Sequence, residues 1–190
     1  MYLFFDTETT GIPKNYKAPI SDLDNWPRLV QLAWFLMDDA GREISSQNRI
    51  IKPEGFAIPL AASAVHGITT ARALEEGVDL GLALSEFAGA LDNSKMLIAH
   101  NLSFDEKIMG AEFLRAKISS EIMFWPRVCT MHSSTDYCEI PGNYGYKWPK
   151  LMELHEKLFG EGFDGAHDAL ADVRACARCF FELRERGVIG

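Results

Sequence analysis

Two carboxylates follow an apolar run at the N-terminus of the chain. Residues Phe5–Gly11 read Phe-Asp-Thr-Glu-Thr-Thr-Gly and follow the aromatic-rich run Tyr2–Phe5, which predicts a short strand buried on both faces. Because side chains alternate along a strand, Asp6 and Glu8 point to one side and Thr7 to the other. Two carboxylates close together at a buried strand end repel each other, and a divalent cation between them would relieve that cost. The alternative is a polar strand end in which one carboxylate caps a turn.

A third carboxylate follows a second apolar run. Residues Met96–Ala99 predict a buried strand that leads into His-Asn-Leu-Ser-Phe-Asp-Glu. Ser103 and Glu106 have the spacing of a capping box, so Ser103 is the expected N-cap of a helix with Asp105 at its second position. The helix dipole favours a carboxylate there whatever its function. Asp105 also lies just past the carboxyl end of a buried strand, where open α/β sheets commonly build sites.

A histidine and a fourth carboxylate lie near the C-terminus. Residues 165–173 read Gly-Ala-His-Asp-Ala-Leu-Ala-Asp-Val, at the start of a helical pattern over Ala169–Arg186. Asp172 lies beside the apolar stripe of this helix, and Ala169 and Ala171 leave room for close approach to a sheet. His167 precedes the helix in a loop, where its imidazole could reach a site and titrate near neutral pH. A surface or capping role for His167 is the alternative.

The elements that must position these residues alternate along the chain. Strands are predicted at Tyr2–Phe5, Leu29–Met37, Glu43–Ile51, Met96–Ala99 and Phe124–Cys129. An Asp-Asp-Ala-Gly turn at residues 38–41 predicts a hairpin between the second and third of these strands. Helices are predicted at Leu80–Leu91, Ser103–Lys117, Pro149–Phe159 and Ala169–Arg186. Strands first and then alternation with helices indicate an α/β fold, a mixed sheet covered by helices.

Composition narrows the class of protein. A chain of 190 residues with 47% hydrophobic content is expected to form a single domain over residues 1–190. It has no stretch near the roughly 20 apolar residues of a membrane span and no signal-peptide pattern, so a cytoplasmic protein without membrane association is expected. Cys176 and Cys179 form one C-x-x-C within a helical pattern, which favours buried helical cysteines over a zinc site.

The net charge of the chain is compatible with a nucleic-acid substrate. The net charge of −8 argues against broad, nonspecific binding to nucleic acid. Carboxylates that hold metal ions would contribute several of these charges, and the bound ions would reverse the local sign. The best basic and aromatic stretch is Tyr144–Lys150, for which an exposed loop is the favoured interpretation. The polar segment Ile12–Pro27 is expected to be a surface loop near the strand end that carries Asp6 and Glu8.

Together the three clusters resemble the motifs of a known family. FDTETTG at Phe5–Gly11, HNxxFD at His100–Asp105 and HxAxxD at His167–Asp172 are similar, in order, to the three motifs of the DEDDh 3′–5′ exonucleases. Supporting similarity occurs at residues 27–33, 65–69 and 150–160, so the resemblance spans about residues 1–185. It implies an RNase H-like fold, in which a five-stranded mixed sheet is flanked by helices. Three motifs in order are far more specific than any one of them.

The resemblance also implies a catalytic set and a cofactor. It assigns catalysis to Asp6, Glu8, Asp105, His167 and Asp172. The four carboxylates would bind two divalent cations about 3.5–4 Å apart, Mg²⁺ with Mn²⁺ as a substitute, and hard oxygen ligands suit both metals. Asp6 would bridge the ions, Glu8 and Asp172 would be further direct ligands, and Asp105 would help to hold the second ion. Neutral His167 would take a proton from the attacking water.

The expected reaction is hydrolysis of the 3′-terminal phosphodiester, which releases nucleoside 5′-monophosphates. By motif position, the residues that bind the terminal nucleotide would be Thr7, Thr9, His66, Asn101 and Phe104. The leading function is a 3′–5′ exonuclease on single-stranded DNA, resembling the epsilon type that proofreads for bacterial replicative polymerase. An RNA-trimming exoribonuclease of the RNase T or oligoribonuclease kind is a second possibility. A non-catalytic nucleic-acid-binding module of a polymerase complex is a third, against which the intact catalytic set argues. The expected partner is nucleic acid with a free 3′ end, and homodimerisation or binding to a polymerase stays open.

Overall fold

The computed structural model describes residues 1–190 and contains one five-stranded mixed sheet with the strand order β3-β2-β1-β4-β5. Strand β2 runs antiparallel to β1 and β3, while β4 and β5 run parallel to β1. The bounds of these strands are β1 Tyr2–Thr9, β2 Leu29–Met37, β3 Glu43–Ile50, β4 Met96–Ala99 and β5 Arg127–Cys129. The predicted mixed sheet and the predicted β2–β3 hairpin are both confirmed. None of the helices is long and apolar enough to cross a membrane.

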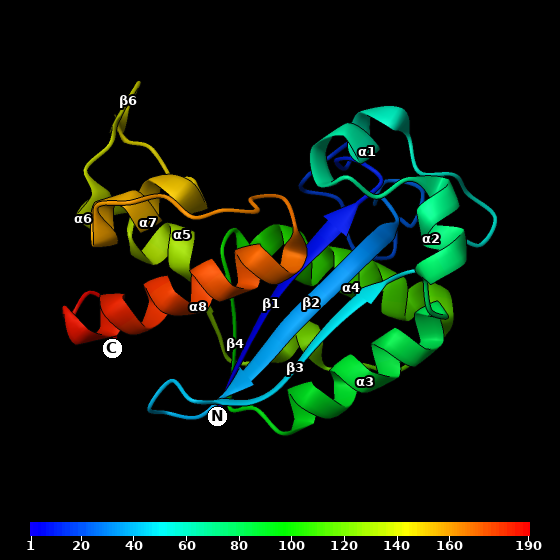
Figure 1. Cartoon of the computed structure of the whole chain (residues 1–190), viewed down its shortest axis with the longest axis horizontal. Helices are drawn as coiled ribbons and strands as arrows, with labels where there is room; N and C mark the ends of the chain where they lie inside the picture. The colour runs from blue at the N-terminus through cyan, green and yellow to red at the C-terminus, as the bar shows by residue number, and fades with distance from the viewer.

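Helices cover both faces of the sheet (Figure 1). Their bounds are α1 Leu60–His66, α2 Thr70–Glu76, α3 Leu80–Asp92, α4 Leu102–Ala116, α5 Thr130–Ser133, α6 Thr135–Cys138, α7 Leu151–Phe159 and α8 Ala169–Glu185. A single-turn 3₁₀ helix, η1, spans Ile122–Phe124, and a two-stranded hairpin joins β6 Pro141–Gly142 to β7 Gly145–Tyr146. Helices α7 and α8 pack on one face of the sheet, and α3 and α4 pack on the other.

The sheet has a hydrophobic core on each face, and the side chains of β1 alternate between these two cores. Tyr2 and Phe4 belong to the core under α8, whereas Leu3 and Phe5 belong to the core under α3 and α4. The strand continues past Phe5, where the sequence predicted its end, because it pairs with β2 as far as Thr9. Continuing this alternation places Asp6 and Glu8 on the α8 side of the sheet. The predicted orientation of the two carboxylates is therefore confirmed.

The starts of β5 and α4 differ from the prediction for identifiable reasons. Strand β5 begins at Arg127 rather than at Phe124, because residues 122–124 form the 3₁₀ turn and Pro126, which cannot donate to a ladder, follows it. Helix α4 begins at Leu102, and its N-cap is Asn101 rather than Ser103. Asn101 has a φ of 68°, a left-handed conformation that asparagine tolerates better than most residues. The sharp turn from β4 into the helix therefore starts the helix before the predicted capping box can form.

The sequence analysis also missed several short elements. Helices α1 and α2 lie in the segment after β3 and enclose a small core that includes Ile58, Ile68 and Ala73. They lie beyond the arrowhead of β1, while the β6–β7 hairpin projects from the opposite side of the molecule near α6 and α7 (Figure 1). Helix α7 begins at Leu151 instead of Pro149. Helices α1 and α2 therefore lie near the carboxyl end of β1.

The loop Ile12–Pro27 is held by a buried ion pair on α4. Glu112 is completely buried, and its Oε1 accepts hydrogen bonds from Arg28 Nε at 2.9 Å, Leu29 N at 2.9 Å and Arg115 Nη1 at 3.0 Å. Arg115 in turn donates to the carbonyl oxygens of Leu23, Trp26 and Pro27. This network fixes the end of the loop against α4 and against the start of β2.

We expect Glu112→Leu to lower the free energy of unfolding by about 3 kcal/mol, because it leaves two guanidinium groups without their buried partner. Thermal and urea unfolding would measure the loss. Glu76→Leu is the matched control, since Glu76 forms an exposed pair with Arg72 and should cost less than about 1 kcal/mol. Equal losses in the two variants would contradict this role of Glu112.

Candidate active site

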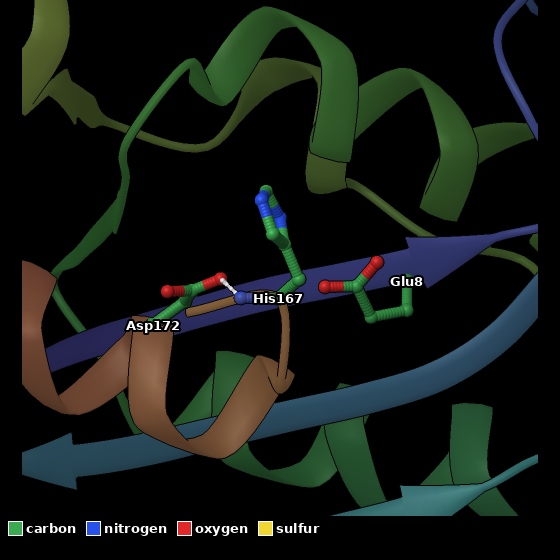
Figure 2. Close-up of side chains that lie close together, drawn as sticks. All are labelled: Glu8, His167 and Asp172. Atoms are coloured by element: carbon green, nitrogen blue, oxygen red, sulfur yellow. Dashed lines mark hydrogen bonds between the residues drawn. The ribbon is translucent and has the colours of Figure 1, made fainter. Parts of the chain in front are cut away.

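Three side chains meet beside the carboxyl end of β1. Glu8 comes from β1, Asp172 comes from the first turn of α8, and His167 comes from the connection between α7 and α8. One possible ligand atom of each lies within 4.8 Å of the others. Figure 2 shows His167 between the two carboxylates, with a hydrogen bond of 3.0 Å from its backbone N–H to Asp172 Oδ2. The structure therefore brings together groups that lie more than 150 residues apart in the chain.

His167 has an unusual backbone conformation. Its φ is 70°, in the left-handed region, and its side chain is exposed. This conformation is costly for a residue with a Cβ and is often found where a side chain must be held in a working position. The bond from the His167 N–H to Asp172 ties the loop to α8. The predicted loop position of His167, from which it can reach the acidic site, is confirmed.

Asp105 joins the cluster from the other face of the sheet. It lies in the first turn of α4 and is buried. Its Oδ1 accepts hydrogen bonds from Thr7 N at 3.1 Å and from Thr7 Oγ1 at 2.7 Å. Thr7 points to the opposite face of the sheet from Asp6 and Glu8. Its contact with Asp105 therefore joins α4 to β1 on that opposite face. The hydroxyl of Thr7 is engaged by Asp105.

One cavity collects most of the predicted site. Its volume is about 280 Å³, and its lining consists of Asp6, Thr7, Glu8, His100, Asn101, Phe104, Asp105, Leu151, His167 and Asp172. All five residues predicted to be catalytic are included, together with three of the five predicted to bind substrate. Phe104 is half-buried and packs partly against the α3–α4 core, so its ring serves both the core and the cavity.

Thr9 and His66 do not line this cavity. Thr9 is buried, and its hydroxyl donates to the Gly11 carbonyl at 2.6 Å. His66 is buried at the end of α1, and its Nδ1 accepts a hydrogen bond from Ile68 N at 3.1 Å. Burial lowers the pKa of His66, which favours the neutral ring. Direct contact of either residue with a substrate stays a prediction.

Gln31 and Asp168 support the site and were not singled out from the sequence. Gln31 pairs with Glu8 across β1 and β2 and is buried. Its Nε2 donates to Asp168 Oδ2 at 3.2 Å, and its Oε1 accepts from Ala169 N at 3.3 Å. Asp168 also caps α8 by accepting from Leu170 N and Ala171 N. As the one polar residue of β2, Gln31 was a signal in the sequence that its side chain needs a buried partner.

The carboxylates of the cavity are in an unfavourable electrostatic state. Burial, followed by the charges of Asp105, Asp172, Glu8 and Asp168, raises the pKa of Asp6 well above its ordinary value. Burial and the neighbouring carboxylates raise the pKa of Glu8 to about 8. Burial raises the pKa of Asp105 to about 7 against the two hydrogen bonds from Thr7, and that of Asp172 to about 6. In the metal-free protein these four carboxyl groups therefore cannot all ionise at neutral pH without mutual repulsion.

Comparison with known proteins assigns the family. A family model described as RNase_T, exonuclease, matches residues 3–180. The chain belongs to this exonuclease family. The family predicted from the three motifs is thus confirmed, and with it the enzyme class of an exonuclease. A search of curated proteins returned no match.

Solved exonuclease structures share the fold. Exonuclease I of E. coli in complex with a dT13 oligonucleotide has a TM-score of 0.76 and 22% identity, over 97% of this chain and 41% of that chain. The same enzyme with dA16 gives a TM-score of 0.75 and 22% identity, over 97% and 41%. Its zinc-bound complex with single-stranded DNA gives 0.74 and 22%, over 97% and 40%. The chain thus spans about two fifths of the length of these proteins, and the likeness confirms the predicted RNase H-like exonuclease fold.

The donor set of the cavity fits a divalent cation. Members of the exonuclease family depend on divalent metal, and the four carboxylates supply oxygen ligands, which hard cations prefer. A cation between them would favour their ionised forms and so oppose the raised pKa values. The residues that repel one another in the metal-free protein are therefore those suited to hold the ion.

We expect the metal-free exonuclease to lose stability as the pH rises from about 4.5 to about 8. Glu8 has an ordinary pKa of 4.5 and a folded pKa of about 8, so the folded state binds more protons than the unfolded state across this window. Stability must then fall with rising pH, and Asp105 and Asp172 act in the same direction up to about 7 and about 6. Thermal unfolding in EDTA across this range would measure the effect.

Excess Mg²⁺ should flatten this pH dependence, because the bound cation replaces the proton. Glu8→Gln in EDTA should also give a shallower slope than the unaltered protein. Glu43→Gln is the matched control, since Glu43 is exposed on β3, far from the cluster in the sheet order. A slope unaffected by Mg²⁺ and by Glu8→Gln would show that the cluster does not dominate the pH response.

Proposed function

We propose that this chain acts as a single metal-dependent 3′–5′ exonuclease domain, with single-stranded DNA as its preferred substrate and nucleoside 5′-monophosphates as its products. The observation that carries the proposal is the single cavity in which four carboxylates and His167 meet at the end of β1. Single-stranded DNA is favoured because the exonuclease I structures that share the fold hold single-stranded oligonucleotides. A cytoplasmic location and likeness to the polymerase-associated epsilon type stay predictions.

Asp6, Glu8, Asp105 and Asp172 would hold two Mg²⁺ ions, for which Mn²⁺ could substitute. Metal ions in such sites acidify the attacking water and stabilise charge on the leaving 3′ oxygen. Ligand atoms of Glu8 and Asp172 lie within 4.8 Å of a ring nitrogen of His167. Asp6 is close enough to these two carboxylates and to Asp105 for their charges to raise its pKa. Thr7 orients Asp105 through two hydrogen bonds.

His167 would act as the general base. It is exposed within the cavity lining, so its ring can reach a water molecule beside the scissile phosphate. Its backbone bond to Asp172 fixes the loop while the side chain stays free to accept the proton. Asn101 and Phe104, at the start of α4, also line the cavity, and a terminal nucleotide can stack there on the phenyl ring.

The test is the polarity and metal dependence of degradation. A 5′-labelled single-stranded DNA should shorten one nucleotide at a time in Mg²⁺, with release of 5′-monophosphates, and EDTA should stop the reaction. A 3′-phosphorylated copy controls for recognition of the free 3′ end, and Asp172→Asn controls for a contaminating nuclease. Internal cleavage, or no metal-dependent release from any strand, would overturn the proposal. Faster degradation of RNA than of DNA of matched sequence would instead identify the protein as an exoribonuclease.

A further inference from the structure

An aromatic arm stands beside the catalytic cavity. We define the aromatic arm as residues 141–148, Pro-Gly-Asn-Tyr-Gly-Tyr-Lys-Trp, which include the β6–β7 hairpin. All eight residues are exposed, and the rings retain 104% exposure at Tyr144, 51% at Tyr146 and 63% at Trp148. The hairpin projects from the body of the molecule (Figure 1). Large aromatic side chains gathered on one exposed segment indicate a binding surface.

The base of the arm is fixed to the catalytic cavity. Pro149 directly follows Trp148, is buried, and accepts a hydrogen bond from His100 Nε2 at 3.0 Å. The other ring nitrogen, His100 Nδ1, lies 3.0 Å from Thr130 Oγ1 at the start of α5. Both His100 and Leu151, two residues after Pro149, line the catalytic cavity. The position of Trp148 relative to the reacting groups is therefore set by short connections.

A second cavity includes the start of α4 and His132, a neighbour of the aromatic arm. The Trp148 ring contacts the exposed ring of His132, with 4.8 Å between centroids. His132 lines a cavity of about 400 Å³ together with Leu102 and Ser103. These two residues lie at the start of α4 between Asn101 and Phe104, which line the catalytic cavity. The two cavities thus share the N-terminal turn of α4, and Trp148 packs on His132, which lines the second one.

The chemistry of the arm favours a nucleic-acid strand over a protein. The arm has no Leu, Ile, Val or Met that would form a continuous aliphatic patch, and it contains Lys147, a residue type depleted at protein interfaces. It offers rings that can stack on bases, and Lys147 and Lys150 supply cations beside the rings. Lys147 pairs with Glu153 at 2.6 Å, and both groups are partly exposed, so a phosphate can compete for the ammonium group. Aromatic rings beside basic groups are typical of surfaces that bind single strands.

We propose that the aromatic arm and His132 form a base-stacking platform for the single-stranded segment immediately upstream of the 3′-terminal nucleotide. The inference rests on the proposed exonuclease function and extends it to the length and form of the substrate. Stacking needs no base identity, so the platform tolerates any sequence, but it requires bases that are not paired in a duplex. Substrates long enough to reach Trp148 gain affinity from the platform, and a mononucleotide ester gains none.

The test compares substrates of two lengths. For single-stranded DNA of about ten nucleotides, Trp148→Ala should raise KM about tenfold, the loss expected for one stacked base, with kcat unchanged. For the p-nitrophenyl ester of thymidine 5′-monophosphate, both constants should stay the same. Trp148→Phe should restore most of the affinity for the long strand. Phe124→Ala is the matched control, because Phe124 is 82% exposed but precedes β5, at the amino ends of the parallel strands β1, β4 and β5, whereas the cavity lies at their carboxyl ends.

Binding is measured separately from catalysis, so that the two proposals can fail independently. Fluorescence anisotropy of a labelled ten-mer in Ca²⁺ should show weaker binding by Trp148→Ala and by Tyr144→Ala than by Phe124→Ala. Unaltered binding and unaltered KM in Trp148→Ala would overturn the platform and leave the exonuclease function standing. If the unaltered protein has no exonuclease activity but its affinity for the ten-mer still depends on Trp148, the platform is supported and the exonuclease function is overturned. Conversion of a dimer into a monomer by Trp148→Ala, with strand affinity unchanged, would make the arm an interface between copies and overturn the platform.

Discussion

Asp6→Asn is expected to abolish exonuclease activity while making the metal-free protein more stable. The amide keeps the size of the side chain but supplies no negative charge for a cation, so kcat should fall on the order of a thousandfold, as for loss of one preorganised electrostatic group. In the folded metal-free protein, burial and the charges of four neighbouring acids raise the pKa of Asp6. The native state must therefore bind a proton or hold a repelled charge, and asparagine requires neither.

The gain in stability should grow with pH, since the cost of keeping Asp6 protonated grows with pH. At pH 8 in EDTA we expect the free energy of unfolding to rise by at least about 1 kcal/mol, or about 2–4 °C in the melting temperature. Asp22→Asn is the control, because Asp22 is exposed in the loop Ile12–Pro27. An active Asp6→Asn variant, or one that melts below the unaltered protein in EDTA, would show that Asp6 is not a strained metal ligand.

Sequence patterns predicted the positions of the candidate residues in the fold wherever the signal was local. Alternation along an apolar strand was enough to place Asp6 and Glu8 on one side of the sheet, and β1 confirms it. The loop position of His167 followed from the start of a helical pattern that begins, as predicted, at Ala169. The DEDDh motifs then connected these separate segments, a connection that periodicity by itself cannot make. One cavity now contains all five residues.

The errors arose where tertiary contacts decide the outcome. The capping box at Ser103 satisfied local rules, but the turn out of β4 uses Asn101 with a positive φ and starts α4 earlier. The hydroxyl of Thr7 donates to Asp105 on a helix 98 residues further along the chain, a contact that the sequence did not indicate, and the role of Thr7 in substrate binding stays a prediction. The support that Gln31 gives to the start of α8 depends on strand register and on a residue 137 positions away. No local pattern in the sequence specifies such pairs.

His167→Ala is expected to lose at least two orders of magnitude in kcat, the usual contribution of a general base, while it retains metal and substrate binding. The structure offers two readings of this residue, because a ring nitrogen of His167 lies within 4.8 Å of carboxylate oxygens of both Glu8 and Asp172. As a metal ligand, His167 would be needed for cation affinity, whereas as a base it would not. Hard cations such as Mg²⁺ prefer oxygen, which favours the base. Titration calorimetry of Mg²⁺ binding should therefore give the same affinity for the variant and for the unaltered protein.

His167→Gly adds a second and sharper measurement. Glycine adopts a φ of 70° without strain, and the backbone N–H that binds Asp172 is kept, so the loop should hold its course while a space opens where the ring stood. Imidazole added to the buffer can then enter that space and accept the proton, and it should restore part of the lost kcat. Asp172→Asn, which keeps His167 but lacks a metal-binding charge, should not respond to imidazole. Full activity of His167→Ala, or loss of Mg²⁺ affinity in step with kcat, would rule out the base and leave His167 as a ligand or a bystander.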